Sequence, residues 1–121
     1  MTEVVTELFA PSPSQIAAAR HFAVAAAADL GCRSADLGLV VSELATNACV
    51  HAKSPFTVTV VRHDGGILVE VADDDPSPVA VMELTIGPSG RGMHIVASVA
   101  KDWGTSPREP GKTVWAVLDC S

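Results

Sequence analysis

The spacing of hydrophobic residues changes at Pro55, and this change constrains the fold more than any other feature of the sequence. Before Pro55, apolar residues recur every three or four positions, as on one face of an α-helix. After it, β-branched residues fill two short runs, 56–62 and 67–72, that are typical of strands. The chain therefore combines a helical part with a sheet.

Three helices are predicted. The segment Ser12-Pro13-Ser14-Gln15 has the pattern of a helix start, and we expect that helix to reach about Leu30 before Gly31 stops it. Ser34 is the predicted N-cap of a second helix, and residues 93–101 form a third. The second helix has one apolar stripe, made of Leu37, Val40, Val41, Leu44, Ala45 and Ala48.

Five strands are predicted around these helices. A first strand covers 4–9, and the runs 56–62 and 67–72 form a hairpin through His63-Asp64-Gly65-Gly66. A second hairpin pairs 103–108 with 112–118, and the proline-rich stretch 76–89 reads as a long loop. This order predicts one α+β domain over residues 1–121: a two-layer α/β sandwich whose mixed, mostly antiparallel sheet is covered on one face by three helices.

Composition excludes several classes of function. The 121 residues carry 8 Lys and Arg against 14 Asp and Glu, a net charge of −6, which argues against direct binding of nucleic acid. The longest apolar run, 22–28, is far shorter than the roughly 20 residues of a membrane span. The acidic N-terminus lacks the pattern of a secretory signal. We therefore expect a cytoplasmic protein that does not contact the membrane.

The three cysteines, Cys32, Cys49 and Cys120, match no zinc or redox spacing. We expect them to be reduced, small and mostly buried side chains. The four histidines also lack the spacing of a metal site or a nucleophile triad, so neither is predicted from them.

Three segments contain residues suited to chemistry. Glu43 and Asn47 share one face of the second helix, where they could accept a proton and offer an oxygen to a divalent cation. Asp73 begins an acidic run where a strand enters the long loop, and its carboxylate could bind an exocyclic amine such as that of adenine. Ser89-Gly90-Arg91-Gly92-Met93 precedes the third helix and could receive phosphate oxygens. Each segment alone also fits an ordinary solvated surface or a plain helix start.

Taken in order, four motifs are more specific. They are Val41 to Ala48, Asp73 to Pro76, Gly90 to Val96, and Gly111 to Trp115. The series resembles the histidine-kinase-like (GHKL) ATPases, which have the Bergerat fold, and in particular the anti-sigma factor serine kinases and their small single-domain bacterial relatives. The resemblance extends from about residue 10 to residue 118.

The resemblance implies ATP and Mg²⁺ as cofactors. It makes Glu43 the general base, Asn47 the ligand of Mg²⁺, and Asp73 the residue that binds the adenine amino group. The remaining nucleotide contacts that it implies are Gly90, Arg91, Gly92, Met93 and Thr113. Residues 76–89 would form a lid over the nucleotide.

Two departures from the family pattern stand out. The family's first glycine motif is usually Asp-x-Gly-x-Gly, whereas Asp75 and Ser77 occupy the glycine positions here. The lid stretch 76–89 also has neither Lys nor Arg, so Arg91 is the nearest cation in the sequence.

The resemblance implies a kinase that binds a sigma factor and phosphorylates a serine or threonine of an antagonist protein, with a homodimer as an open possibility. A second reading is a nucleotide-responsive interaction module with little or no catalysis, which the two departures favour. A third is a relative of the same fold that binds partners without nucleotide.

Overall fold

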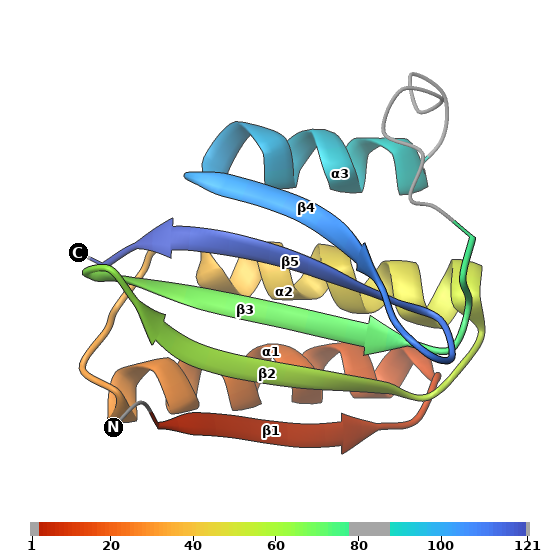
Figure 1. Cartoon of the computed structure of the whole chain (residues 1–121), viewed down its shortest axis with the longest axis horizontal. Coiled ribbons are helices and arrows are strands. Elements are labelled where there is room, and N and C mark those ends of the chain that lie inside the picture. The colour runs from red at the N-terminus through yellow and green to blue at the C-terminus, as the bar shows by residue number, and fades with distance from the viewer. Residues whose placement is uncertain (1–2, 78–87, 121) are drawn as a thin grey trace.

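A computed structural model of the chain describes residues 3–77 and 88–120, and it shows helices layered on one face of a five-stranded sheet (Figure 1). The strand order is β1-β2-β3-β5-β4, and every neighbouring pair is antiparallel. The predicted α+β sandwich is confirmed, although the described sheet has no parallel pair and so is not mixed. The elements are β1 (Val4–Phe9), α1 (Pro13–Asp29), α2 (Leu37–Thr46), the π-helical turn η1 (Asn47–Ala52), β2 (Phe56–His63), β3 (Gly66–Asp73), α3 (Pro88–Val99), β4 (Asp102–Pro107) and β5 (Lys112–Asp119).

Helix α1 begins as predicted, whereas α2 begins later than expected. Ser12 is the N-cap of α1, Pro13 opens the helix, and Gly31 follows its end with a φ of +83° that suits glycine. The prediction that Ser34 caps α2 is wrong, because the N-cap is Asp36. The Ser34 carbonyl instead accepts a bond from the Leu37 N–H, so a turn precedes the helix.

The helical region continues beyond α2 without a break. Residues Asn47–Ala52 form η1, a π-helical turn, and Lys53 ends it in the left-handed region with a φ of +53°. Such π turns are rare and are frequent at functional sites. The turn sets the position of Asn47, a predicted site residue, at the junction of two helical geometries.

The core lies between the helices and the inner face of the sheet. Every member of the apolar stripe predicted for the second helix is at most 1% exposed, which confirms that assignment. Strands β2 and β3 alternate buried and half-buried residues, as expected of a sheet covered on one face. Their connection has positive φ at Asp64 (+45°) and Gly65 (+80°), the signature of a tight hairpin turn, so the predicted hairpin is confirmed.

Helix α3 is longer at its start than the sequence suggested. We expected it to begin at Met93, after the glycine segment, but it begins at Pro88. Proline suits the first turn of a helix because its φ is already helical and its missing N–H has no partner there. Gly90 and Gly92 consequently lie within the helix rather than before it. The predicted lid lies mostly in 78–87, outside the described residues.

The helices of the described chain are too short or too polar for any of them to cross a membrane.

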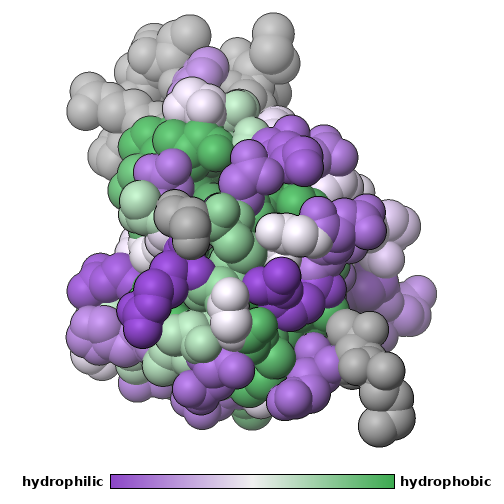
Figure 2. Space-filling model, turned by 90° about the vertical axis from the view of Figure 1, so that its left-hand side faces the viewer, coloured by the Kyte–Doolittle hydropathy of each residue, from purple (hydrophilic) through white to green (hydrophobic). Residues whose placement is uncertain are grey.

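The expectation of three reduced cysteines is wrong for two of them. Cys32, after α1, and Cys120, after β5, form a disulfide with a Cα–Cα distance of 5.1 Å. They are 88 residues apart in sequence, so only the return of β5 to this end of the sheet brings them together. Figure 2 views this end and shows hydrophobic surface between hydrophilic side chains. Cys49 remains a free thiol.

Reduction of the disulfide should destabilise the fold, because an 88-residue loop in the unfolded chain is released. We expect the Cys32→Ser/Cys120→Ser variant to lose about 2–4 kcal/mol of unfolding free energy relative to the oxidised chain. Urea unfolding with and without a reductant measures the difference. Cys49→Ser is the control and should respond to reductant as the unmodified chain does. Equal midpoints for the oxidised and reduced chains would contradict the prediction.

Candidate functional site

The predicted site residues come from elements that meet at one end of the molecule. Strand β3 ends there, α2 passes into η1 there, and α3 starts there (Figure 1). Helix α2 packs against β3 and α3, and η1 also packs against β3. Segments that are far apart in the sequence are therefore brought together around the end of β3.

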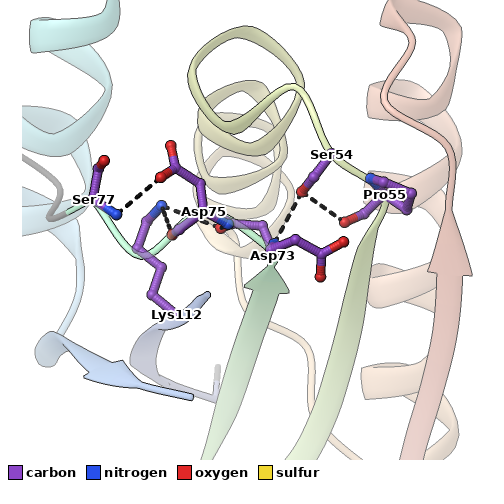
Figure 3. A network of polar contacts seen from close by, with 7 residues as sticks. Ser54, Pro55, Asp73, Asp75, Ser77 and Lys112 are labelled. Carbon is purple, nitrogen blue, oxygen red and sulfur yellow. Dashed lines mark hydrogen bonds and ion pairs between the residues drawn. The ribbon is translucent and has the colours of Figure 1, made fainter. Parts of the chain in front are cut away.

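An ion pair between Asp73 and Lys112 lies at this end of the sheet. Asp73 is the last residue of β3 and is only 2% exposed, and Lys112, at 8%, is its direct partner at the start of β5. The Lys112 Nζ lies 3.2 Å from Asp73 Oδ1 and donates a further bond of 3.0 Å to the carbonyl oxygen of Asp75 (Figure 3). Lys112 therefore balances the buried carboxylate and holds the chain that leaves β3.

Gly111 allows this approach. Its φ is +91°, and a side-chain carbon placed on it would collide with the backbone of Asp73 and Asp74. Glycine is the one residue that combines this backbone conformation with such close contact. The β4–β5 connection can therefore lie directly on the acidic turn.

The acidic turn is closed by side-chain acceptors in place of the family's glycines. Asp73 Oδ1 accepts the N–H of Asp75, and Asp75 Oδ1 accepts the N–H of Ser77, each at 2.9 Å. The bond from Ser77 lowers the pKa of Asp75, with a smaller contribution from the charge of Lys112. Neither Asp75 nor Ser77 is among the described residues with positive φ, so this backbone does not require glycine.

Ser54 ties the end of η1 to the same turn. It is 8% exposed, its Oγ accepts the N–H of Asp74 at 3.0 Å, and it donates to the Pro55 carbonyl at 2.9 Å (Figure 3). This serine was not among the predicted site residues. A serine before a proline has no distinctive sequence signal, so only the fold gives it this role.

Glu43 and Asn47 lie on the helical side of the site. Glu43 is half-buried on α2, and this burial raises the pKa of its carboxyl above the ordinary range. Asn47 is 8% exposed, and its Nδ2 donates to the Sδ of Met93 at 3.1 Å. With the amide nitrogen engaged, Oδ1 is the atom of Asn47 that is suited to a hard cation. Met93 is fully buried, so it joins α2 to α3 at this point.

The glycine segment belongs to the start of α3. Gly90, Arg91 and Gly92 lie in the first turns of α3. The first N–H groups of a helix have no partner within the helix and favour phosphate oxygens. This part of α3 is therefore suited to an anion, and its predicted contacts with nucleotide remain predictions.

Thr113 is not brought together with Asp73. The strand register pairs Asp73 with Lys112 and places Thr113 opposite Ala72. Adjacent residues of a strand point to opposite faces, so Thr113 lies on the face of the sheet away from the helices. The residue opposite Asp73 is Lys112, and the implied contact of Thr113 with nucleotide stays a prediction. The alternation along 112–118 contained this information, but it could be used only once the strand register was known.

A family model matches most of the chain. The model of the histidine kinase-like ATPase domain matches residues 9–118, which include every predicted site residue. The chain belongs to the histidine kinase-like ATPase family. Membership of this family implies that the chain binds ATP.

A solved structure shares the fold. The chain is similar to the crystal structure of the RsbU and RsbW domains of Rv1364c from Mycobacterium tuberculosis, with a TM-score of 0.70 and 15% sequence identity. The similarity covers 98% of this chain and 32% of that one, so the histidine kinase-like ATPase chain spans about a third of the length of the protein it matches. A search of curated proteins found no match.

Loss of Lys112 should strongly destabilise this ATPase domain, because it leaves Asp73 buried without its partner. We expect Lys112→Met to cost about 3–5 kcal/mol of unfolding free energy. The double variant Asp73→Asn/Lys112→Met should recover part of this loss, since neither charge then remains buried. Chemical unfolding of Lys112→Met, of Asp73→Asn and of the double variant measures the coupling free energy between the two side chains.

Lys101→Met is the matched control. Lys101 pairs with Asp119 at 3.5 Å on the surface, and an exposed pair of this kind contributes about 0–1 kcal/mol. If Lys112→Met cost no more than Lys101→Met, the ion pair would not support the site.

Glu43 should make stability depend on pH in a defined direction. Because burial raises its pKa, the folded chain retains a proton that the unfolded chain has already released. Stability should therefore fall as the pH rises through the range between the two pKa values, and Glu43→Gln should remove that part of the slope. Unfolding free energies measured from pH 4 to pH 8 test this, and identical slopes would contradict it.

Proposed function

We propose that the chain is a Mg-ATP-dependent regulator of the anti-sigma type, which binds a sigma factor and phosphorylates a serine or threonine of an antagonist protein. The observation that carries the proposal is the convergence of Glu43, Asn47, the buried Asp73 and the start of α3 at one end of the sandwich. Family membership and the similarity to a chain that contains an RsbW domain support it.

The residues of the site suit both the adenine ring and the phosphates of a nucleotide. Asp73 would accept a hydrogen bond from the adenine amino group, in an orientation held by Lys112 and by the N–H of Asp75. The N–H groups of the first turn of α3, around Gly90 and Gly92, would receive phosphate oxygens, and Arg91 is the cation nearest to the lid stretch in the sequence. Met93 would act through its contact with Asn47.

The donor set also suits a magnesium ion. Bound Mg²⁺ would neutralise charge on the phosphates, which is the chemistry that phosphoryl transfer requires. The described residues include no group of three or more His, Cys, Asp or Glu that could enclose a metal. Mg²⁺ is commonly held by one or two protein oxygens together with substrate phosphates, and Asn47 Oδ1 would be such a protein ligand.

Glu43 would act as the general base. A base is most effective when its pKa lies near the working pH, and burial moves the pKa of Glu43 in that direction. Its carboxylate would take the proton of the acceptor hydroxyl as that oxygen forms a bond to the terminal phosphorus of ATP, while the bond from this phosphorus to the bridging oxygen breaks and ADP leaves. Positioning and charge neutralisation would supply the rest of the rate enhancement.

Labelled ATP tests the kinase proposal. Incubation with the cognate antagonist should label a serine or threonine, and Glu43→Gln should lower the rate by about 10²–10⁴-fold, the usual contribution of a general base. Calorimetry should give a similar ATP affinity for both proteins, since the base does not hold the nucleotide. An unlabelled antagonist, or labelling that Glu43→Gln does not change, would refute phosphoryl transfer.

The second candidate function is a nucleotide-responsive interaction module without significant catalysis. The closed acidic turn at Asp75 and Ser77 favours it, because these side chains already fill positions where the family usually has glycine. Tight ATP binding without turnover would support the module.

A third candidate is partner binding without nucleotide. In that case calorimetry would detect no ATP binding, and Asn47→Ala would leave partner binding unchanged.

A further inference from the structure

The face of the sheet opposite the helices carries a large aromatic residue and several aliphatic ones. The strand registers place Leu68, Trp115 and Val117 together on this face, and no helix of the described chain covers it (Figure 1). A solvated sheet face normally carries polar side chains. Trp115 lies on this open face and is half-buried.

The indole of Trp115 lies close to the neighbouring strand. Its direct partner on β4 is Gly104, and a side-chain carbon built on Gly104 would lie 2.7 Å from Cζ2 and 3.0 Å from Cε2 of the indole. Any residue with a side chain would therefore push the ring away. Glycine at this position leaves room for the indole beside the backbone of β4.

Carboxylates stand beside this ring. Glu70 is the direct partner of Trp115 on β3, and Asp102 lies across from Val117 on β4. Together these side chains border a groove of about 310 Å³. The groove is lined by His63, Leu68, Glu70, Asp102, Ser106, Trp115 and Val117.

The groove has an excess of negative charge. Its lining contains two carboxylates and no Lys or Arg. The nearby cation Lys101 is engaged with Asp119 at 3.5 Å, and His63 lies 3.8 Å from Asp64. Asp102 Oδ1 accepts the N–H of Trp103, which orients that carboxylate.

We propose that this groove binds an arginine side chain presented by a partner protein. A guanidinium is attracted to the face of an indole and pairs with carboxylates through parallel hydrogen bonds. Here the ring of Trp115 would receive the cation, Glu70 and Asp102 would accept its N–H groups, and Leu68 and Val117 would contact the aliphatic stem. A second copy of this chain suits the groove less well, because each copy has a net charge of −6.

This docking site stands apart from the nucleotide site. The groove lies on the open face of the sheet, whereas Asp73 and Lys112 are buried on the helical side. The proposal therefore holds whether or not the chain binds ATP, and both sites could be filled together.

Trp115 fluorescence tests the proposal directly. The chain has two tryptophans, so Trp103→Phe leaves Trp115 as the single indole reporter. We would titrate this variant with a blocked five-residue peptide that has a central arginine between two leucines. A matched peptide with citrulline, which keeps the shape but removes the charge, serves as the comparison. The arginine peptide should change the emission saturably and bind about tenfold more tightly than the citrulline peptide.

Two charge variants in the same background locate the site. Glu70→Gln should weaken binding of the arginine peptide by about five- to tenfold. Glu7→Gln makes the same change in charge on β1, at the opposite edge of the sheet, and should leave binding unchanged.

Three results would overturn the proposal. The first is equal binding of the arginine and citrulline peptides, or no binding of either. The second is an equal effect of Glu70→Gln and Glu7→Gln. The third is a dimer in sedimentation velocity that Glu70→Arg dissociates, since a second copy would then cover the groove.

Discussion

The ion pair between Asp73 and Lys112 is the interaction on which the candidate site depends. It joins the ends of two central strands, and through the second bond of Lys112, to Asp75, it also fixes the turn that leaves β3. A buried charge is tolerated only when it is paired and hydrogen-bonded. The same pair therefore stabilises the fold and orients the carboxylate that is proposed to bind adenine.

The surroundings of this pair explain how the family's glycine motif can change without loss of the turn. Glycines in such a loop allow unusual backbone angles and close approach to a ligand. In this chain Asp75 and Ser77 close the turn with side-chain and backbone hydrogen bonds instead. One glycine is still needed for close packing. At Gly111 the backbone of the β4–β5 connection lies directly against the backbone of the acidic turn.

The two faces of the sheet serve different purposes. The inner face supports the helices and ends in the charged residues of the candidate site. The outer face places an indole in one groove with two carboxylates, which suits a cationic side chain. Because side chains alternate along a strand, one strand, β5, contributes Lys112 to the first face and Trp115 to the second.

The sequence by itself determined the local elements and the type of fold. Periodicity located the buried stripe of α2, turn residues located the β2–β3 hairpin, and the order of motifs led to the ATPase family. These properties depend on neighbours within a few residues, or on motifs that retain their order. The sequence predicted the starts of two helices wrongly: Asp36 and not Ser34 caps α2, and α3 begins at Pro88 rather than at Met93.

Only the tertiary structure decided which distant residues meet. It paired Asp73 with Lys112, and it joined Cys32 to Cys120. Both outcomes depend on strand register and on where β5 begins and ends. A shift of one residue moves every side chain of a strand to the other face, and no pattern within the strand itself reports which partner it will have.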